Sequence, residues 1–551
     1  MVESLIKKKA FKGRKGPLLL IIMDGVGFGK YKEGDGFAAA TTEVLDELME
    51  TSPWVKLKAH GTAVGLPSDA DMGNSEVGHN AIGCGRVFDQ GAKLVEKSIE
   101  TGAMFEGAVW KKLVSNVKQS GGTLHFLGLL SDGNVHSNVA HLKAMIVQAK
   151  KEGVTKVRIH ALLDGRDVGE TSALEYFDPF EEFLKEQRDD SFDARIASGG
   201  GRMVITMDRY NANWDMVRKG WETHVLGEGR QFKSAHEAIE TLRNETGAID
   251  QDLPPFVIGE NGKPVGTVQD GDSFILFNYR GDRALEITKS FESGDDFNEF
   301  DRKRKPEVEY AGMMEYDGDL HIPKQFLVSP PTIDRTLSEY LVATGVKQYS
   351  ISETQKYGHI TYFFNGNRTE KFDEKLETYV EIPSDILPFE QRPWMKCADI
   401  ADNVIDVIEE GEYEFIKMNF PNGDMVGHTG NWEAVLCSME ALDLSIGRIK
   451  EAVEKAGGIM VISADHGNSD DMFEHNKKTG AVVIKENGKP KAKTSHSLNP
   501  VPCIIYDPES KNEYSGKLNE GLGISSLAAT CIELLGYEPP EDYDKSVLNF
   551  T

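Results

Sequence analysis

The sequence predicts an α/β protein whose principal sheet is assembled from both ends of the chain. Three short apolar runs, bounded by Gly and Pro, are typical of strands buried on both faces: residues 18–23, 413–420 and 459–464. Asp24 follows the first run directly. Asp424 and His428 follow the second, and Asp465 and His466 follow the third. Because ligands gather at the carboxyl ends of strands in an open α/β sheet, these side chains are expected at one edge, as a candidate metal site.

The length and charge of the chain restrict the classes of protein to consider. A chain of 551 residues exceeds the size of one core, so two domains are expected, with three as the alternative. The formal net charge of -27 argues against nucleic acid as a main partner, because affinity for phosphate backbones comes mostly from clustered Lys and Arg. A small anionic substrate remains compatible, since it needs only a few local arginines.

Cysteine usage and the absence of address signals point to the cytoplasm. The five cysteines are widely separated, and none forms a C-x-x-C pair, which is typical of a reducing compartment. The run at 18–23 is too short for a signal peptide, and no apolar stretch approaches the length of a transmembrane helix. The Lys-rich residues 1–16 are interpreted as a solvated tail.

The middle of the chain has its own βα rhythm and is interpreted as an inserted domain. Its expected strands lie at 123–130, 156–163, 202–207 and 273–279. Since the metal-type residues occur only near 24 and in 424–496, residues 1–89 and 329–551 are predicted to form one discontinuous domain around an inserted domain at 90–328. Connectors near 89–91 and 325–331 are the expected hinges. The Lys-rich stretch 474–493 is predicted to be an exposed loop or hairpin.

The carboxylates and imidazoles near the C-terminus favour a divalent metal site. Asp424 and His428 have the i,i+4 spacing that places two ligands on one helical face. A single Asp-x-x-x-His pair is more often an ordinary hydrogen-bonded pair, but Asp24, Asp465-His466 and His496 point to the same edge. A set without Cys suits Mn²⁺, Mg²⁺, Co²⁺ or Zn²⁺. Two ions are expected, because five or six ligands are too many for one catalytic ion with open positions.

A Gly-flanked loop at 71–79 contains the candidate nucleophile Ser75. It is not the G-x-S-x-G elbow of α/β-hydrolases, because its second Gly falls one residue late. Asn74 or Ser75 could simply cap a helix. Both interpretations are compatible, since a serine at a helix N-terminus beside a divalent metal has its alkoxide stabilised by both.

The inserted domain contains a set of cationic residues that border expected strands and turns, which favours an anion pocket. Arg forks pair bidentately with phosphate and carboxylate. Each arginine alone is more often solvated, but the set as a whole favours a binding role. Its members are His136, Arg166 beside Asp167, Arg202, Arg209, Arg280 and Arg283.

These residues belong to motifs that resemble those of the cofactor-independent phosphoglycerate mutases, a family of the alkaline-phosphatase-like metalloenzymes. The resemblance covers nearly all of the chain. The matching motifs are MDG (23–25), GNSEVGHN (73–80), SDGNVH (131–136), DGRD (164–167), MDR (207–209), NYRGDR (278–283), ETQKY (353–357), NFPNGDMVGH (419–428), ADHGN (464–468) and TSH (494–496). The segment from 199 to 209 has one more residue between its two arginines than the bacterial pattern, and the chain's length is closer to plant and kinetoplastid members.

The resemblance implies a doubly wound phosphatase-like domain with two Mn²⁺-type ions, Co²⁺ or Mg²⁺ being alternatives, and an inserted substrate domain. One ion would be bound by Asp424, His428 and His496. The other would be bound by Asp24, Ser75, Asp465 and His466. Ser75 would be the nucleophile that carries the phosphoryl group between the 3- and 2-hydroxyls of glycerate, and Asp167 the general acid/base. The residues implied to hold phosphate and carboxylate are His136, Arg166, Arg202, Arg209, Arg280, Arg283 and Lys356.

Two other functions remain open from the sequence. A phosphohydrolase or sulfatase-like enzyme would use the same metal–serine core but would admit water, whereas a mutase must hold glycerate and exclude water. A non-catalytic binding protein is disfavoured, because every candidate ligand and the serine are present. Apart from a phosphoglycerate substrate, no nucleic acid or membrane partner is expected, and the chain is predicted to be a monomer.

Overall fold

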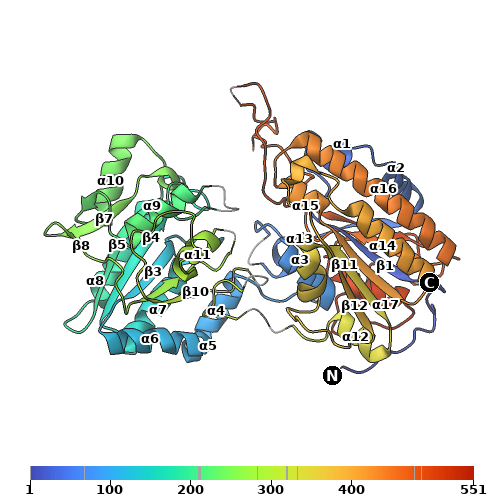
Figure 1. Ribbon diagram of the computed structural model, residues 1–551, viewed down its shortest axis with the longest axis horizontal. Helices are drawn as coiled ribbons and strands as arrows, with labels where there is room; N and C mark the ends of the chain where they lie inside the picture. The colour runs from blue at the N-terminus through green and yellow to red at the C-terminus, as the bar shows by residue number, and fades with distance from the viewer. Residues whose placement is uncertain are drawn as a thin grey trace. The chain divides into compact units, whose positions relative to one another are not determined.

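The computed structural model describes residues 2–66, 69–208, 213–281, 283–317, 321–329, 331, 333–476, 478–485 and 487–550. The chain forms two compact units. Unit 1 comprises Met1–Gln90 and Pro331–Thr551, and unit 2 comprises Gly91–Pro330. In Figure 1, unit 1 contains both blue and yellow-to-red segments, so both ends of the chain build it.

Unit 1 is built on a seven-stranded sheet with the order β12-β11-β13-β1-β14-β15-β2. Neighbouring strands from β12 to β14 are parallel, whereas β15 is antiparallel to both β14 and β2. The strands are β1 (Leu18–Met23), β2 (Trp54–Leu57), β11 (Gln348–Glu353), β12 (Glu377–Ile382), β13 (Phe415–Phe420), β14 (Ile459–Ser463) and β15 (Val501–Tyr506). The helices around this sheet complete the predicted α/β class, which is confirmed.

The helices of unit 1 bury their apolar faces in one hydrophobic core with the sheet. The longer ones are α2 (Glu43–Thr51), α3 (Ser75–Cys84), α12 (Leu337–Thr344), α14 (Cys397–Glu410), α16 (Trp432–Ala456) and α17 (Ser526–Leu534). The shorter ones are α1 (Gly36–Ala39), η1 (Gly61–Val64), α13 (Thr354–Gly358), η3 (His359–Phe363), η4 (Phe389–Gln391) and α15 (Asn422–Gly427). Within the described ranges, no helix of either unit has the length and apolar character needed to cross a membrane.

Strand register places the three expected metal-bearing segments side by side. Strand β1 lies between β13 and β14, with Met23 opposite Phe420. The backbone N–H of Asp24 donates to the Phe420 carbonyl at 3.0 Å. Gly25 then turns the chain with φ 74°, and a Cβ there would lie 2.5 Å from the Asp424 nitrogen, so only glycine fits this close approach.

Unit 2 has a second sheet with the order β10-β9-β3-β4-β5-β7-β6, and β8 pairs with β7. The strands are β3 (Leu124–Leu129), β4 (Lys156–Leu163), β5 (Asp193–Gly201), β6 (Gln231–Phe232), β7 (Phe256–Glu260), β8 (Lys263–Pro264), β9 (Ser273–Leu276) and β10 (Glu309–Gly312). The helices are α4 (Ala92–Glu100), α5 (Ala103–Glu106), α6 (Ala108–Ser120), α7 (Val139–Lys151), α8 (Ala173–Gln187), α9 (Trp214–His224), α10 (Ala235–Thr246), η2 (Asp250–Asp252) and α11 (Leu285–Glu292). Two separate hydrophobic clusters pack in this unit.

The prediction of a strand at residues 202–207 is wrong. The strand is instead β5, which ends with three glycines at 199–201, and residues 202–207 turn away from the sheet. A Cβ at Gly199 would lie 2.5 Å from the Phe256 ring and 2.6 Å from the Ala161 carbonyl oxygen. The glycines therefore allow close packing inside the strand, although glycine clusters usually indicate loops.

The stretch 474–493 contains antiparallel bridges between His475 and Val482 and between Ile484 and Pro490, and most of its described residues are exposed. The prediction of an exposed loop or hairpin is confirmed, and the segment is a hairpin.

Candidate active site

Ser75 is the first residue of α3, and its hydroxyl is not used to cap the helix, because Asn74 is the cap. The Asn74 side chain accepts a hydrogen bond from the Val77 backbone N–H at 3.0 Å. The Ser75 side chain is nearly buried, at 5% exposure, and its Oγ lies 3.2 Å from Asp24 Oδ1 and 3.0 Å from His466 Nε2. Of the two caps allowed by the sequence, the helix uses Asn74.

Three side chains lie in mutual contact at the next part of the site: those of Asp424, His428 and His496. The Nε2 atoms of both histidines lie 3.1 Å from Asp424 Oδ1 and 3.1 Å from each other. Their Nδ1 atoms face backbone carbonyls: Thr494 O is 2.6 Å from His428, and Gly73 O is 2.7 Å from His496. A carbonyl only accepts, so each Nδ1 donates a proton to it, and the two Nε2 atoms face the same space, which is the orientation that two histidine ligands of one metal ion would need.

His466 has the same orientation on the other side of the site. Its Nδ1 lies 3.1 Å from the Gly467 carbonyl, and its Nε2 faces Ser75 Oγ. Burial acts to lower the pKa of His466, but the carboxylates of Asp465, Asp424 and Asp24 outweigh burial and raise it.

Lys356, predicted as a substrate ligand, lies among the metal-type residues of unit 1. Its ammonium is 2.5 Å from Ser75 Oγ, 2.7 Å from Asp424 Oδ2 and 2.9 Å from Asp24 Oδ1. Burial acts to lower its pKa, but the charges of Asp24 and Asp424 outweigh burial and raise it. Lys356 is therefore a charged donor aimed at the candidate nucleophile.

The pKa values of the two carboxylates beside Lys356 are shifted in opposite directions, although burial acts to raise both. Burial raises the pKa of Asp24 to about 6, and the charge of Asp465 adds to the rise. Burial also opposes ionisation of Asp424, but the positive charge of Lys356 outweighs it and holds the pKa well below the usual value. Several buried carboxylates around one ammonium are an environment that favours additional cations.

His79 is a site residue that the sequence reasoning missed. Its Nδ1 lies 2.8 Å from the Ser75 carbonyl and 3.3 Å from Asp465 Oδ2, while its Nε2 lies 3.1 Å from Asn419 Nδ2. Asn419 also donates to Asp24 Oδ2 at 2.7 Å. The signal was present, since Ser75 and His79 have the same i,i+4 spacing as Asp424 and His428.

The donor set fits divalent cations. In each of two groups, Asp424 with His466 and His496, and Asp24 with His79 and Asp465, candidate ligand atoms all lie within 4.8 Å of one another. Asp465 Oδ2 is buried and accepts no hydrogen bond from the described residues, although His79 Nδ1 lies 3.3 Å away and His466 Nε2 3.6 Å away. A buried carboxylate oxygen in that state needs a positive partner. Carboxylate and imidazole donors without thiolate suit borderline divalent ions.

In unit 2, the carboxyl ends of adjacent strands carry the predicted anion-binding residues. Asp164, just after β4, accepts from Arg202 Nη1 at 2.9 Å and from Ser131 Oγ at 2.6 Å. The same Arg202 nitrogen also donates to Asp167 Oδ2. Arg202 is 1% exposed, so this guanidinium is buried against two carboxylates. The structure thus brings together Arg202 and Asp167, two of the predicted residues.

The other predicted residues lie on the loops after β3, β4 and β9. His136 is buried, and its carbonyl accepts from the Tyr279 backbone N–H at 2.8 Å. Arg283 is nearly buried, and its Nη1 donates to the Met207 carbonyl at 2.6 Å. Arg166 is exposed, Arg280 is half-buried, and Arg209 lies outside the described residues.

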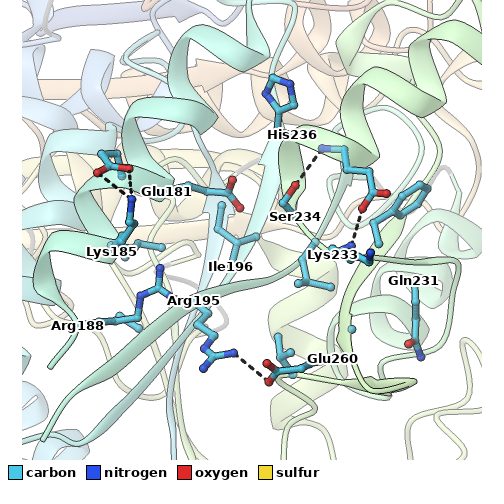
Figure 2. Close-up of a pocket in the computed structure, with 18 of the residues that line it drawn as sticks. Glu181, Lys185, Arg188, Arg195, Ile196, Gln231, Lys233, Ser234, His236 and Glu260 are labelled. Carbon is cyan, nitrogen blue, oxygen red and sulfur yellow. Dashed lines mark hydrogen bonds and ion pairs between the residues drawn. The ribbon is translucent and has the colours of Figure 1, made fainter. Parts of the chain in front are cut away.

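A hollow of about 910 Å³ in unit 2 lies elsewhere, at the amino end of β5 (Figure 2). Its lining includes acidic and basic side chains, and Arg195 forms an ion pair with Glu260 at 3.2 Å. None of the predicted site residues lines this hollow. The chemistry of the strand ends, rather than cavity size, locates the candidate site.

The chain is similar to known proteins over nearly its whole length. The family model described as BPG-independent PGAM N-terminus matches residues 95–318. A probable 2,3-bisphosphoglycerate-independent phosphoglycerate mutase of Leptospira interrogans is 52% identical over 99% of both chains. The corresponding mutase of Trypanosoma brucei brucei is 48% identical over 100% of both chains. A crystal structure of Leishmania mexicana phosphoglycerate mutase at low cobalt concentration has a TM-score of 0.73, with 45% identity and 100% coverage of both chains.

An open α/β sheet that places aspartates and histidines at its strand ends, beside a serine at the start of a helix, has the donor set of a metalloenzyme. Within that class, identity near one half over the whole length is decisive. The chain belongs to the family of 2,3-bisphosphoglycerate-independent phosphoglycerate mutases. It is accordingly an isomerase that depends on divalent metal.

Proposed function

We propose that this chain interconverts 3-phosphoglycerate and 2-phosphoglycerate in glycolysis and gluconeogenesis, by passing the phosphoryl group through Ser75 without a bisphosphoglycerate cofactor. The observation that carries the proposal is the surroundings of the Ser75 hydroxyl, which lies within hydrogen-bond distance of Asp24, His466 and the Lys356 ammonium. A hydroxyl surrounded by potential bases and one cation is suited to act as a nucleophile. A coupled assay for 2-phosphoglycerate formed from 3-phosphoglycerate, without added 2,3-bisphosphoglycerate, tests it.

We propose two divalent ions per chain, Mn²⁺ in the first place, with Co²⁺ or Mg²⁺ as alternatives. Asp424, His428 and His496 would hold one. Asp24, Ser75, Asp465 and His466 would hold the other. Bound divalent ions supply Lewis-acid stabilisation of a serine alkoxide and of phosphoryl oxygens.

The protein's own residues have distinct roles in the proposed reaction. Lys356, charged and 2.5 Å from Ser75 Oγ, neutralises negative charge that develops on this oxygen. Asp167 acts as general acid/base toward the glycerate hydroxyls, and its contact with Arg202 orients it. The proposed ligands of phosphate and carboxylate are His136, Arg166, Arg202, Arg209, Arg280, Arg283 and Lys356.

On this proposal unit 1 is the metal-binding phosphatase-like domain and unit 2 the substrate-binding and phosphotransferase domain. The enzyme is proposed to act as a cytoplasmic monomer with a phosphoglycerate as its only substrate. Light scattering on a size-exclusion column tests the oligomeric state, because a monomer elutes with a mass of 61.0 kDa.

Asp167→Asn is expected to leave KM nearly unchanged and to slow turnover by roughly 10²–10⁴-fold, the usual contribution of general acid–base catalysis. Asparagine keeps the size and still accepts from Arg202, but it does not take up a proton. The coupled assay measures both constants. Asp178→Asn is the matched control, because Asp178 lines the 910 Å³ hollow of unit 2 and contacts His236 instead. Wild-type turnover in Asp167→Asn would contradict the general acid/base role and would leave Asp167 only the structural role of pairing with Arg202.

Arg283→Lys is expected to raise the ratio of phosphate release to isomerisation. Lysine cannot form the bidentate pair of an arginine, so glycerate would be held less firmly while the phosphoryl group is on the enzyme. Phosphate release and 2-phosphoglycerate formation are measured on the same sample. Arg195→Lys, at the Arg195–Glu260 pair in Figure 2, is the control and should leave the ratio unchanged. A proportional loss of both activities in Arg283→Lys would argue against retention of glycerate by this residue.

A further inference from the structure

A buried chain of hydrogen bonds crosses unit 2 and is not explained by the proposed chemistry. It runs from the amino end of β9, across β3, β4 and β5, to the loop before α9. Every member exposes 3% of its surface or less. The members, in order, are Asp272, His125, His160, Ser198, His224 and Thr206.

All five links have hydrogen-bond geometry. Asp272 Oδ2 lies 3.0 Å from His125 Nε2, and His125 Nδ1 lies 3.0 Å from His160 Nε2. His160 Nδ1 lies 2.7 Å from Ser198 Oγ. The remaining links join Ser198 Oγ to the Nδ1 atom of His224 at 2.7 Å and the Nε2 atom of His224 to Thr206 Oγ1 at 3.0 Å.

The Asp272 carboxylate at one end determines which atom donates in every hydrogen bond of this network. Asp272 accepts from the backbone N–H groups of Thr123 and Gln269, each at 2.7 Å. Burial opposes its ionisation, but the hydrogen bond from His125 outweighs burial and lowers the pKa of Asp272. Asp272 is therefore an ionised acceptor, and His125 must donate to it from Nε2.

The histidines are neutral, so each carries a single ring proton. Burial lowers the pKa of His125 and His160 and lowers that of His224 to about 3. With Nε2–H of His125 committed to Asp272, His160 must donate from Nε2 and accept at Nδ1 from the Ser198 hydroxyl. By the same rule His224 donates from Nδ1, and its Nε2 accepts the proton of the hydroxyl at the end of the chain.

That last hydroxyl belongs to Thr206, which has a strained backbone. Its φ is 68°, a left-handed conformation that is rare for a β-branched residue. Its backbone N–H donates to the Met216 carbonyl at 2.9 Å. Gly220 allows this packing, because a Cβ there would lie 2.2 Å from Thr206 Oγ1. The hydrogen bond to His224 thus holds a conformation that the residue would not adopt alone.

The turn at Thr206 leads directly to a proposed substrate ligand. The next residue, Met207, accepts at its carbonyl from Arg283 Nη1 at 2.6 Å. Asp208 then accepts from the backbone N–H of Asn213 at 2.6 Å. The backbone direction at Thr206 therefore decides where the carbonyl that orients Arg283 lies.

We infer that Thr206 and His224, held by the buried chain that begins at Asp272, are positioning residues for the phosphoglycerate anion. They fix the turn that presents the Met207 carbonyl to Arg283. This inference rests on the proposed role of Arg283 as a substrate ligand.

The kinetic test compares Thr206→Val with Thr206→Ser. Valine keeps the β-branched shape but removes the hydroxyl, so KM for 3-phosphoglycerate is expected to rise roughly tenfold, as for one lost buried hydrogen bond, with a smaller change in kcat. Serine keeps the hydroxyl and should restore KM to within about twofold. Thr223→Val is the matched control: Thr223 is also buried, in α9, and among the described residues its hydroxyl donates only to the Lys219 carbonyl, at 2.8 Å.

A purely structural role would lower thermal stability and the active fraction without moving KM, and that result in Thr206→Val would overturn the inference. An equal rise in KM in Thr223→Val would also overturn it. A wild-type enzyme without mutase activity would instead refute the proposed function.

Nuclear magnetic resonance of ¹⁵N-histidine-labelled protein tests the chain without any substrate. The expected ring protons are on Nε2 in His125 and His160 and on Nδ1 in His224. Asp272→Asn is expected to shift the ring-nitrogen signals of His224, although Asp272 touches only the first histidine. Unchanged His224 signals in Asp272→Asn, or the opposite tautomer in the wild type, would overturn the linked chain.

Discussion

Ser75→Ala is expected to abolish mutase turnover, by a factor on the order of 10⁵–10⁶, the usual cost of removing a catalytic nucleophile. The change removes one oxygen and no apolar volume. Lys356 keeps its ion pairs with Asp424 and Asp24, at 2.7 Å and 2.9 Å. The fold should therefore persist, and the thermal unfolding temperature should stay close to that of the wild type. Coupled turnover and unfolding are measured on the same preparation.

A matched control separates loss of the nucleophile from loss of any buried hydroxyl. Ser445 in α16 is also buried, and its hydroxyl bonds the Ala441 carbonyl at 2.9 Å. Ser445→Ala should turn over like the wild type. Mass spectrometry of acid-quenched wild-type enzyme should place a phosphoryl group on Ser75. A phosphoryl group on another residue, or turnover by Ser75→Ala, would refute the assignment.

Removal of divalent metal is expected to reduce turnover by roughly 10⁴-fold or more, because Lewis-acid stabilisation of the alkoxide and of the phosphoryl oxygens each contributes several kcal/mol. Lowering the pH should release metal and activity together, since histidines such as His428 and His496 bind metal only as neutral rings. The protein should also unfold at lower temperature without metal, because a ligand at 100 times its Kd stabilises the folded state by about 2.7 kcal/mol.

Chelation, metal analysis and add-back form the experiment. Mn²⁺ should restore activity best, with Co²⁺ and Mg²⁺ as the comparison ions. His428→Asn should raise the metal concentration needed for reactivation. His236→Asn is the control, since His236 is an exposed histidine of unit 2 that contacts Asp178. Full turnover in a sample shown to contain no metal would contradict the metal requirement.

The arrangement at the edge of the unit 1 sheet could be anticipated from local patterns. An apolar run that ends in Asp24 reads as a buried strand delivering a carboxylate, and β1 does end at Met23. Parallel neighbours have their carboxyl ends at one edge, so Asp424 and Asp465 were expected beside it. The hydrophobic patterns indicate three buried strands, and the tertiary structure decides that they lie in the order β13-β1-β14.

Several features could not be predicted because they depend on contacts between distant segments. The strand β5 was misplaced, since its glycines serve close packing against Phe256 rather than a turn. His79 follows Ser75 at the i,i+4 spacing, but this spacing alone does not identify a site residue, because the contacts of His79 form only when α3 lies against Asn419 and Asp465. The left-handed Thr206 has no local sequence signal at all.

The sequence by itself determined the chemical identity of the site: which carboxylates, imidazoles and hydroxyl follow which strand. That information is local, because hydrophobic periodicity and the turn after each strand select the residues at its end. Only the tertiary structure decided the orientation and the tautomer of each candidate histidine ligand. His496 presents Nε2 to Asp424 because its Nδ1 donates to the carbonyl of Gly73, 423 residues away in the chain. Ring orientation and tautomer depend on such hydrogen bonds, and these exist only after distant segments have packed together.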